Sequence, residues 1–350
     1  MPISITRAAG GRFPERLQRA SVRATLGVLY AALAAVFVAA PAAAQAPAWP
    51  AHPLRIVVPF PPGNAGDVTA RAIADKLTGS LGQPIVVDNR PGAQGAIGVA
   101  AVAQAPADGY TLLVTSLSPL VITPSVTRRP EYDPMKDLAP VALIGWTGMI
   151  MVAPRSFPAD TIAALVAHAR SHRGQLSYAS LGSGTLSMLT MELFKQAAAI
   201  DLLHVPYKGS SQALTDLVGG RVDLMFDGMT SSYGQVKAGN LKALAVSATR
   251  RSAFAPEIPT LAESGVPGLK NFDVVGWTGM LAPAHTPPAV IDRLNAKVAR
   301  IMQQADFKAR VASQSLDIYA PQTPAQFGTF MREELGRWGA IVKALNIEPE

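Results

Sequence analysis

Short apolar runs alternate with helix-like stretches along most of this chain, and this alternation limits the available folds more than any other feature. Leu54–Pro59, Pro84–Asp88 and Tyr110–Thr115 have the length and apolar character of buried strands. Ala65–Ser80 and a segment of small residues ending near Ala105 have the composition of helices. Strands separated by helices predict βαβ units, so we expect an α/β fold with a parallel sheet.

The pattern breaks and then starts again, which predicts two lobes. Gly148–Ala153 and Trp277–Pro283 read as strands that cross between the lobes. We expect two α/β lobes joined by these crossing strands: residues 47–150 and 273–350 form lobe 1, and the inserted residues 151–272 form lobe 2. Open α/β sheets bind ligands at the carboxyl ends of their strands, so the expected ligand site is a cleft between the lobes.

The first 44 residues have the organisation of an export signal. Five arginines precede an apolar run of 15 residues from Leu26 to Ala40, and small residues follow it. A positive region, an apolar region and an A-x-A site predict a signal peptide at residues 1–44, cleaved near Ala44. The apolar run is shorter than the roughly 20 residues that span a bilayer, although an uncleaved anchor is the alternative. We expect the mature protein in a bacterial periplasm.

Charge and composition argue against several classes of partner. The chain carries 31 Lys and Arg and 24 Asp and Glu, a net charge of +7, but residues 1–44 hold five of the arginines and one acid, which leaves +3 for the rest. Runs of basic residues are absent from the sequence, so nucleic acid is not an expected partner. The sequence has no cysteine for a disulfide or a lipid anchor, and its 49% of hydrophobic residues suffice for a sizeable core.

The loop between Pro59 and Asp67 follows a predicted strand and opens a predicted helix. Gly63 permits a tight turn, and the first amides of a helix have no partner inside it, so the loop is suited to bind an anion. A plain strand-to-helix turn is the alternative. Asp67, four residues before Arg71, also suits a helix cap. The candidate ligand-binding residues of this loop are Phe60, Gly63, Asn64, Ala65 and Asp67.

A second loop, between Ser180 and Ser187, repeats the same arrangement in the other lobe. It offers glycine flexibility, hydroxyl side chains and another helix N-terminus, and a well-capped helix is the alternative. The turn after the Tyr110–Thr115 strand adds hydroxyls, and an aspartate ends the strand at residues 226–228, where a turn aspartate is the alternative. The candidate residues outside the first loop are Ser116, Ser118, Gly182, Ser183, Gly184, Thr185, Ser187 and Asp227.

Motifs for catalysis are poorly represented. The sequence has no G-x-S-x-G, no H-E-x-x-H and no cysteine nucleophile. His168 and His172 are four residues apart on a predicted helix, but a third metal ligand is not evident and a solvated helix end is favoured. His204 reads as structural, and Trp146 and Trp277 read as packing or hinge residues. We expect no enzyme activity, no metal and no cofactor; an enzyme on the same bilobed fold is the alternative.

Seven short motifs follow one another along the chain in a specific order. They are Ile56–Phe60 with Pro62, Gly63 and Asp67; Asn89–Ala93; Asp108–Leu113; His204–Gly209; Val222–Asp227; Leu281–Pro283; and Arg293–Asn295. Each motif alone is weak, but the ordered set closely resembles the substrate-binding receptors of tripartite tricarboxylate transporters, also called the Bug family. The resemblance implies a bilobed periplasmic binding protein-like fold of type II that closes on its ligand.

The resemblance also implies how a ligand is held. The family typically binds a carboxylate through backbone amides of the first loop, often with ordered waters, and lobe 2 contributes its glycine- and hydroxyl-rich loop and the aspartate matched by Asp227. This favours the anion site over the plain turn and makes Asp67 a site residue as well as a cap. The implied function is capture of a di- or tricarboxylate, an amino acid or an aromatic acid, for uptake or sensing.

Two residues depart from the family pattern. Asn64 stands where the family usually has a second glycine; asparagine tolerates left-handed backbone angles, so the turn can survive, and its side chain can narrow the pocket. Met188 stands where many members have a histidine, which predicts a less polar pocket wall. The implied partners are the membrane subunits of a transporter or a sensor kinase, and we expect a monomer.

Overall fold

The computed structural model describes residues 1, 4, 49–182, 184–345 and 347. The predicted signal peptide and Ser183 therefore lie outside the described residues, apart from Met1 and Ser4. Residues from Trp49 onwards form one compact unit. Within the described ranges, every helix is too short or too polar to cross a membrane.

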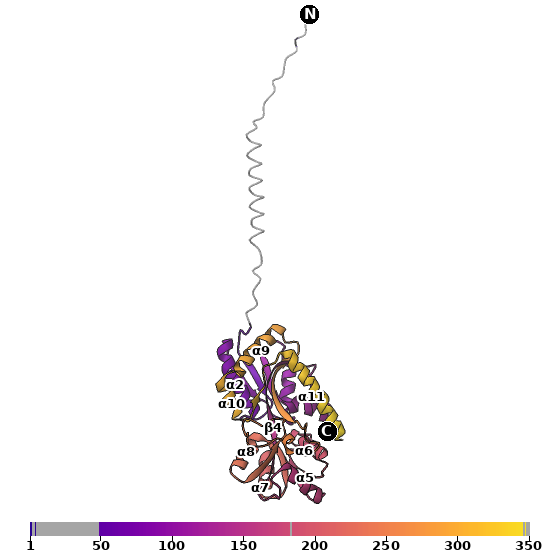
Figure 1. Cartoon of the computed structure of the whole chain (residues 1–350). Helices are drawn as coiled ribbons and strands as arrows, with labels where there is room; N and C mark the ends of the chain where they lie inside the picture. The colour runs from indigo at the N-terminus through magenta and orange to yellow at the C-terminus, as the bar shows by residue number, and fades with distance from the viewer. Residues whose placement is uncertain (2–3, 5–48, 183, 346, 348–350) are drawn as a thin grey trace. The chain divides into compact units, whose positions relative to one another are not determined.

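Strands and helices alternate through this unit (Figure 1). The strands are β1 (Leu54–Val58), β2 (Ile85–Asn89), β3 (Thr111–Ser116), β4 (Leu138–Pro154), β5 (Ser177–Ser180), β6 (Leu203–Pro206), β7 (Leu224–Gly228), β8 (Leu241–Val246), β9 (Val275–Pro283) and β10 (Asp317–Ile318). The α-helices are α2 (Ala65–Leu81), α3 (Ala96–Ala103), α4 (Thr123–Val126), α5 (Ile162–Ser171), α6 (Leu186–Ala198), α7 (Ser210–Val218), α8 (Met229–Lys237), α9 (Pro288–Met302), α10 (Ala305–Ala312) and α11 (Pro324–Ala344). Shorter helical turns are η1 (Ala93–Gly95), η2 (Ser118–Ile122) and η3 (Ala262–Ser264).

Strand β4 connects the two lobes. Its first part pairs antiparallel with β9, from Leu138 opposite Pro283 to Gly148 opposite Val275. Its last part, from Met149 onwards, pairs with β7 and β8. Figure 1 shows β4 between one group of helices that includes α2, α9, α10 and α11 and another that includes α5 to α8. The predicted α/β fold with two lobes is confirmed, but β4 begins ten residues before the predicted crossing strand.

Both lobes contain parallel βαβ units. β1 pairs in parallel with β2 and β3, and β5 pairs in parallel with β6 and β7. The two strands that cross, β4 and β9, are antiparallel to their neighbours. The sheet is therefore mixed: the predicted parallel βαβ units are present in both lobes, and the crossing strands, whose direction was not predicted, pair antiparallel.

The β1 strand is buried on both faces, as expected for a central strand covered by helices. Ile56 and Val58 pack on one side with the apolar stripe of α9, whereas Val57 packs on the other side with the cluster that includes α3. The stripe of α9 includes Leu294 and Val298, four residues apart on one helix face. Each such buried side chain contributes roughly 1.5–3 kcal/mol, and together they fix the β1–α2 loop against the sheet.

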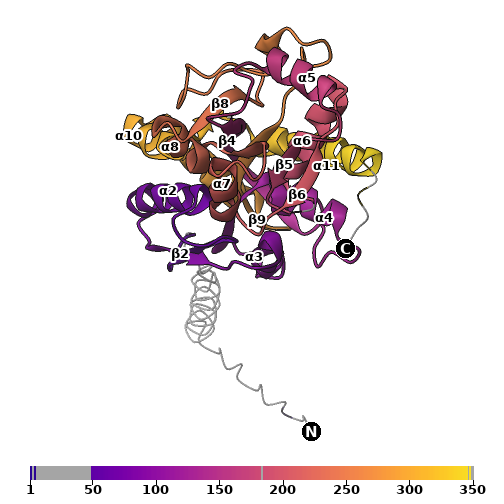
Figure 2. The same cartoon turned by 90° about the horizontal axis from the view of Figure 1, so that it is seen from below.

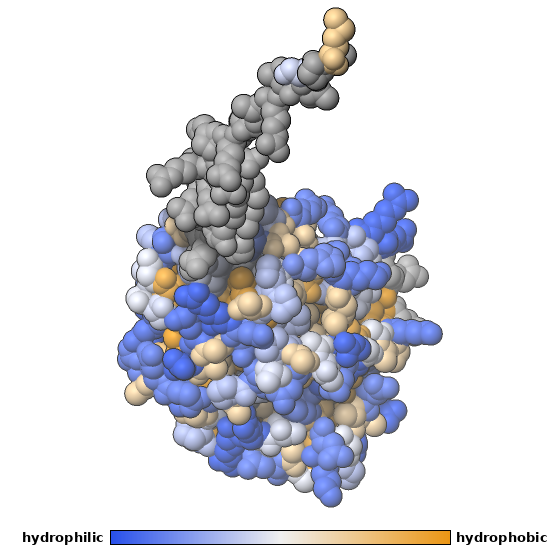
Figure 3. Space-filling model, turned by 90° about the horizontal axis from the view of Figure 1, so that it is seen from above, coloured by the Kyte–Doolittle hydropathy of each residue, from blue (hydrophilic) through white to orange (hydrophobic). Residues whose placement is uncertain are grey.

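Contacts between the lobes also involve α8 and α10, which lie next to each other in the view from below (Figure 2). The Thr230 hydroxyl, at the start of α8, donates 2.9 Å to the carbonyl of Gln314 and lies 2.8 Å from the hydroxyl of Ser315. On the face drawn in Figure 3, hydrophilic side chains predominate and strongly hydrophobic ones show mainly in gaps between them. That face resembles a water-exposed protein surface rather than a large apolar docking face.

Candidate functional site

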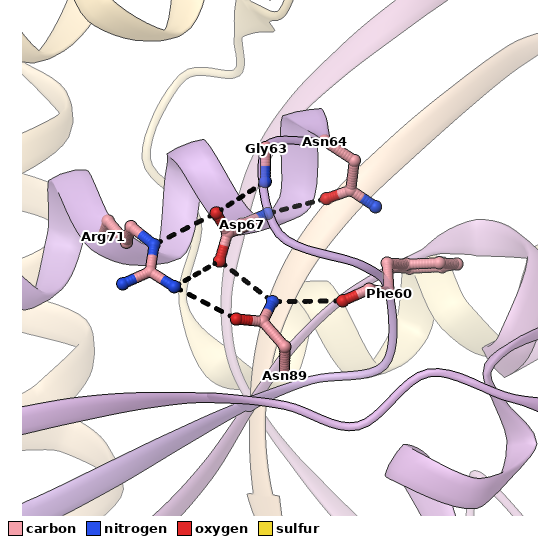
Figure 4. Close-up of polar contacts among 6 residues, drawn as sticks. All are labelled: Phe60, Gly63, Asn64, Asp67, Arg71 and Asn89. Carbon is pink, nitrogen blue, oxygen red and sulfur yellow. Dashed lines mark hydrogen bonds and ion pairs between the residues drawn. The ribbon is translucent and has the colours of Figure 1, made fainter.

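Asp67 lies at the centre of the first loop, and its carboxylate is hydrogen-bonded to neighbouring residues of the protein (Figure 4). One carboxylate oxygen accepts the N–H of Gly63 at 2.9 Å and the Nε of Arg71 at 3.0 Å. The other accepts the amide of Asn89 at 2.9 Å and pairs with Arg71 at 3.0 Å. Asn89 also donates to the carbonyl of Phe60 at 3.0 Å. The side chain of Asp67 therefore holds the whole turn between β1 and α2.

The environment of Asp67 keeps it charged. Burial alone would raise the pKa of this carboxyl, since the residue is only 3% exposed. Hydrogen bonds from Arg71, Gly63 and Asn89 outweigh burial and lower the pKa below its ordinary 3.8. In this structure the carboxylate of Asp67 is used to hold the loop between β1 and α2 in shape.

Asn64 is the residue that caps α2. Its side-chain oxygen accepts the N–H of Asp67 at 2.8 Å, and its backbone is extended, with φ −76° and ψ 169°. The tolerance of asparagine for left-handed angles is not used at Asn64, because Gly63 supplies the left-handed residue of the turn with φ +88°. Gly63 therefore makes the turn, and Asn64 caps the helix with its side-chain oxygen.

Three N–H groups at the start of α2 remain for a ligand. Those of Asn64, Ala65 and Gly66 have no acceptor among the described residues, whereas those of Gly63 and Asp67 are used within the loop. Unpaired N–H groups at the positive end of a 17-residue helix attract an anion. Phe60 lies beside them: a Cβ at Gly66 would lie 3.7 Å from its ring.

The first loop meets the turn after β3. Gly95 lies between Pro59 and Pro119, so closely that a Cβ at position 95 would lie 2.6 Å from the Pro119 ring and 3.5 Å from Pro59. Ser116 and Ser118 are half-buried beside this contact. The structure thus brings the predicted Ser116–Ser118 turn to the same neighbourhood as the first loop.

The second loop reaches α4 of the other lobe. Gly182 and Gly184 have positive φ angles of 110° and 69°, and a Cβ at Gly184 would lie 3.1 Å from Val126 of α4. Thr185 caps α6, since its hydroxyl oxygen accepts the N–H of Met188. The loop is therefore a well-capped helix start, which was the alternative to a ligand site, and it also contacts the opposite lobe.

Ser187 differs from the other hydroxyl residues of this loop. It is 1% exposed, and its hydroxyl donates to the carbonyl of Phe226 in β7. The predicted contact between its side chain and a ligand is therefore not available in this structure. Ser187 instead attaches α6 to the sheet beneath the loop.

Asp227 organises the ends of two helices. It is 1% exposed; one carboxylate oxygen accepts the hydroxyl of Ser210 at 2.7 Å, and the other accepts those of Ser231 at 2.6 Å and Ser232 at 2.8 Å. Ser210 begins α7, and the other two serines lie in the first turn of α8. These three serines were not among the residues predicted from sequence, although each lies within four residues of the end of a strand.

A serine–histidine pair was also missed. The Ser180 hydroxyl lies 2.6 Å from Nε2 of His204 and accepts the N–H of Gly182 at 3.1 Å. His204 stacks on Tyr178, whose hydroxyl donates to Glu192. Burial lowers the pKa of His204 below 6.5. His204 is therefore structural, as predicted, but the structure it supports is the second loop.

The two other histidines singled out by spacing, His168 in α5 and His172 just after it, have ring centroids 4.1 Å apart. The described part of the chain contains no group of three or more His, Cys, Asp or Glu that could hold a metal.

Comparison with known proteins places the chain among transport receptors. The family model described as "Tripartite tricarboxylate transporter family receptor" matches residues 69–347. The protein BugT of Bordetella pertussis is 37% identical over 320 residues, which cover 91% of this chain and 96% of BugT.

Two solved structures from Rhodopseudomonas palustris are also similar. Rpa4515, whose structure is described as "with adipate", has a TM-score of 0.75 and 32% identity over 86% of this chain and all of its own. MatC, described as having bound malate, has a TM-score of 0.70 and 32% identity over 84% of this chain and all of its own. Together with the family match and the bilobed fold, these likenesses show that the chain belongs to the receptors of the tripartite tricarboxylate transporter family.

Proposed function

We propose that this chain is a periplasmic receptor that captures a small carboxylate between its lobes, for uptake or for sensing. The observation that carries the proposal is the start of α2, where three neighbouring N–H groups lack an acceptor among the described residues. Charge-assisted hydrogen bonds contribute roughly 1.5–3 kcal/mol each, so three give on the order of 4.5–9 kcal/mol. A micromolar dissociation constant needs about 8 kcal/mol, and ordering costs reduce the gross gain. The adipate and malate of the two similar structures support the carboxylate class.

The proposed contacts divide into two groups. Backbone N–H groups of Asn64, Ala65 and Gly66 bind one carboxylate, with Phe60 as an apolar wall. Hydroxyl and amide groups of two other loops position the rest of the ligand, and Asp67, Ser187 and Asp227 support the loops from within. This second group consists of Ser116 and Ser118 in lobe 1 and of Gly182, Ser183, Gly184 and Thr185 in lobe 2.

Export and partners belong to the same proposal. The leader is removed near Ala44, and the mature protein works in the periplasm as a monomer that delivers its ligand to transporter membrane subunits or to a sensor kinase. Intact-mass measurement of the secreted protein tests the first step. A mass that still includes residues 1–44 contradicts cleavage.

The Ser180–His204 pair is the one observation that favours the alternative, a periplasmic enzyme. A serine hydroxyl 2.6 Å from an imidazole is the geometry of an activated nucleophile. Ser180 is fully buried, however, and its hydroxyl already accepts the N–H of Gly182. A substrate carbonyl has no route to this oxygen in the present structure, so the receptor is the better-supported proposal.

A thermal-shift screen tests the receptor. The purified protein is mixed with malate, adipate, citrate, amino acids and aromatic acids, and with the diamides of malate and adipate as uncharged controls. A ligand at 100 times its dissociation constant adds about 2.7 kcal/mol of stability. Stabilisation by the diamides alone contradicts the carboxylate class, and steady consumption of a stabilising acid supports the enzyme.

A further inference from the structure

A cavity of about 240 Å³ lies beside the crossing strands, away from the residues proposed for the carboxylate. Its lining residues come from β4 itself and from segments next to strands that pair with β4. Trp146 belongs to β4 and Val275 begins β9, whereas Arg250 follows β8 and Tyr319 follows β10. β10 pairs with the first part of β4 and β8 with the last part, so the cavity lies where the lobes join.

Two residues that line this cavity, Arg250 and Tyr319, carry hydrogen-bond donors without a partner among the described residues. The guanidinium of Arg250 lies 4.4 Å from the ring centre of Trp146, and in the described part of the chain it has no carboxylate or carbonyl partner. The indole N–H of Trp146, a residue 3% exposed, also lacks a partner there, but this atom is enclosed by protein and does not face the cavity. Tyr319 likewise has a hydroxyl without a hydrogen bond among the described residues, and burial raises its pKa to about 12, so it stays a donor at neutral pH.

An acceptor lines the same cavity as these donors. Asp273 also lines the cavity; one of its carboxylate oxygens accepts the N–H of Thr249 at 3.1 Å, and the other has no partner among the described residues. Arg250 and Asp273 therefore line the same cavity without forming an ion pair with each other. A positive and a negative group held apart leave space for a molecule that carries both charges.

An arginine stacked on a tryptophan is by itself a common packing arrangement. Here the arginine also lines a cavity together with the hydroxyl of Tyr319 and a carboxylate oxygen of Asp273, both without partners among the described residues. A guanidinium can bind a carboxylate in bidentate geometry.

We propose that this cavity is a second ligand site, which binds a small zwitterionic amino acid with its carboxylate on Arg250 and its ammonium group on Asp273. The cavity has the volume of about eight water molecules, which suits a small amino acid. The Tyr319 hydroxyl is placed to donate to the same carboxylate.

Calorimetric titration with L-alanine tests the site. It is done in the Ala65→Glu variant, in which the carboxylate site at the start of α2 is blocked. The new carboxylate at the start of α2 repels anions there, so binding that persists in A65E belongs to another site. In this background we expect Arg250→Gln and Asp273→Asn each to weaken L-alanine binding at least tenfold. Acetate and methylamine, which carry one charge each, should also bind at least tenfold more weakly than L-alanine.

Three results overturn the proposal. They are loss of L-alanine binding in the single variant A65E, acetate binding as tight as that of L-alanine, and no measurable heat with L-alanine. Trp146→Phe keeps the ring under Arg250 and removes only the N–H, so it should retain binding within a few-fold. Melting curves of each variant without ligand separate loss of the site from loss of the fold.

Discussion

The hydroxyl of Ser180 lies between Nε2 of His204 and the N–H of Gly182, at 2.6 Å and 3.1 Å. It links an imidazole in β6 to a loop glycine whose φ is +110°. The same hydroxyl lies 3.5 Å from the carbonyl of Gly182. A hydroxyl has one proton to donate, so the protonation of His204 decides whether that proton goes to the imidazole or to the loop.

This relationship predicts a pH dependence of stability. Burial, the largest cause, lowers the pKa of His204 below 6.5, with Lys195 lowering and Glu192 raising it. The unfolded chain therefore binds this proton first as the pH falls. The stability linked to His204 is fully present above about pH 6.5 and is lost as the pH falls from there through the lower folded-state pKa.

Urea unfolding of His204→Gln at pH 7.5 and pH 5.0 measures this contribution. The variant should lose less stability than the wild type between the two pH values. Ser180→Ala keeps the buried histidine and should keep the wild-type pH dependence. An unchanged pH dependence in H204Q contradicts the assignment.

Asp67→Asn should lower the free energy of unfolding by about 2–4 kcal/mol, because the neutral amide cannot accept from Gly63, Arg71 and Asn89 together. Asp75→Asn is the matched control on the same helix: its exposed ion pair with Arg310 is worth less than about 1 kcal/mol. Chemical denaturation at pH 7 compares the two. Because the pKa of Asp67 is lowered, its contribution is present above pH 3.8 and is lost as the pH falls through the folded value. Equal effects of the two substitutions would remove Asp67 from the centre of the loop.

Two glycines near the first loop should respond differently to alanine. In Gly98→Ala the new Cβ lies 2.8 Å from the Cα of Pro59 and 2.9 Å from the carbonyl oxygen of Arg90, and backbone atoms cannot give way cheaply. We expect a loss of about 3 kcal/mol. Gly63→Ala meets open space and pays only for its left-handed backbone, about 1–2 kcal/mol. Thermal midpoints rank the two variants, and the reverse order contradicts this packing.

Glu334 joins α11 to a crossing strand. One of its oxygens accepts the indole N–H of both Trp277 and Trp338 at 3.1 Å, so Glu334→Ala leaves two buried donors unpaired. The expected loss is about 2–4 kcal/mol, with a shift in tryptophan fluorescence. Glu333→Gln, exposed on the same turn, should change stability by less than about 0.5 kcal/mol. An E334A protein with native fluorescence and stability would show that the pair is not structural.

Local sequence was sufficient for most of the lobes. β1 and α2 each differ from the predicted Leu54–Pro59 and Ala65–Ser80 by one residue at one end. The first part of β4 was missed because Pro140 and Gly145 argue against a strand. Pairing with β9, distant in sequence, overrides both residues through irregular register between Pro140 and Ala142 and between Leu143 and Gly145.

The candidate site shows the same limit. The spacing of Asp67 and Arg71 indicated their pairing, but Asn89 comes from the neighbouring strand and had no local signal. Ser187 was grouped with the loop hydroxyls, although the 3.6-residue period of α6 places it with Met191 and Phe194 on the buried face. That error was avoidable from sequence, whereas the position of Asn89 required the sheet.

Strand β4 runs without interruption for 17 residues through both lobes. The lobes are therefore not modules joined by a tether. A chain cut near Gly148 would leave each half with a truncated strand and exposed backbone donors and acceptors, which invite aggregation. Any relative rotation of the lobes must be absorbed as torsion within a hydrogen-bonded ribbon, so the stiffness of that ribbon sets the energy of the motion. A chimaera that exchanges lobes between related proteins would have to be joined in the middle of a strand. Each half of β4 must therefore match the strands it pairs with in both lobes.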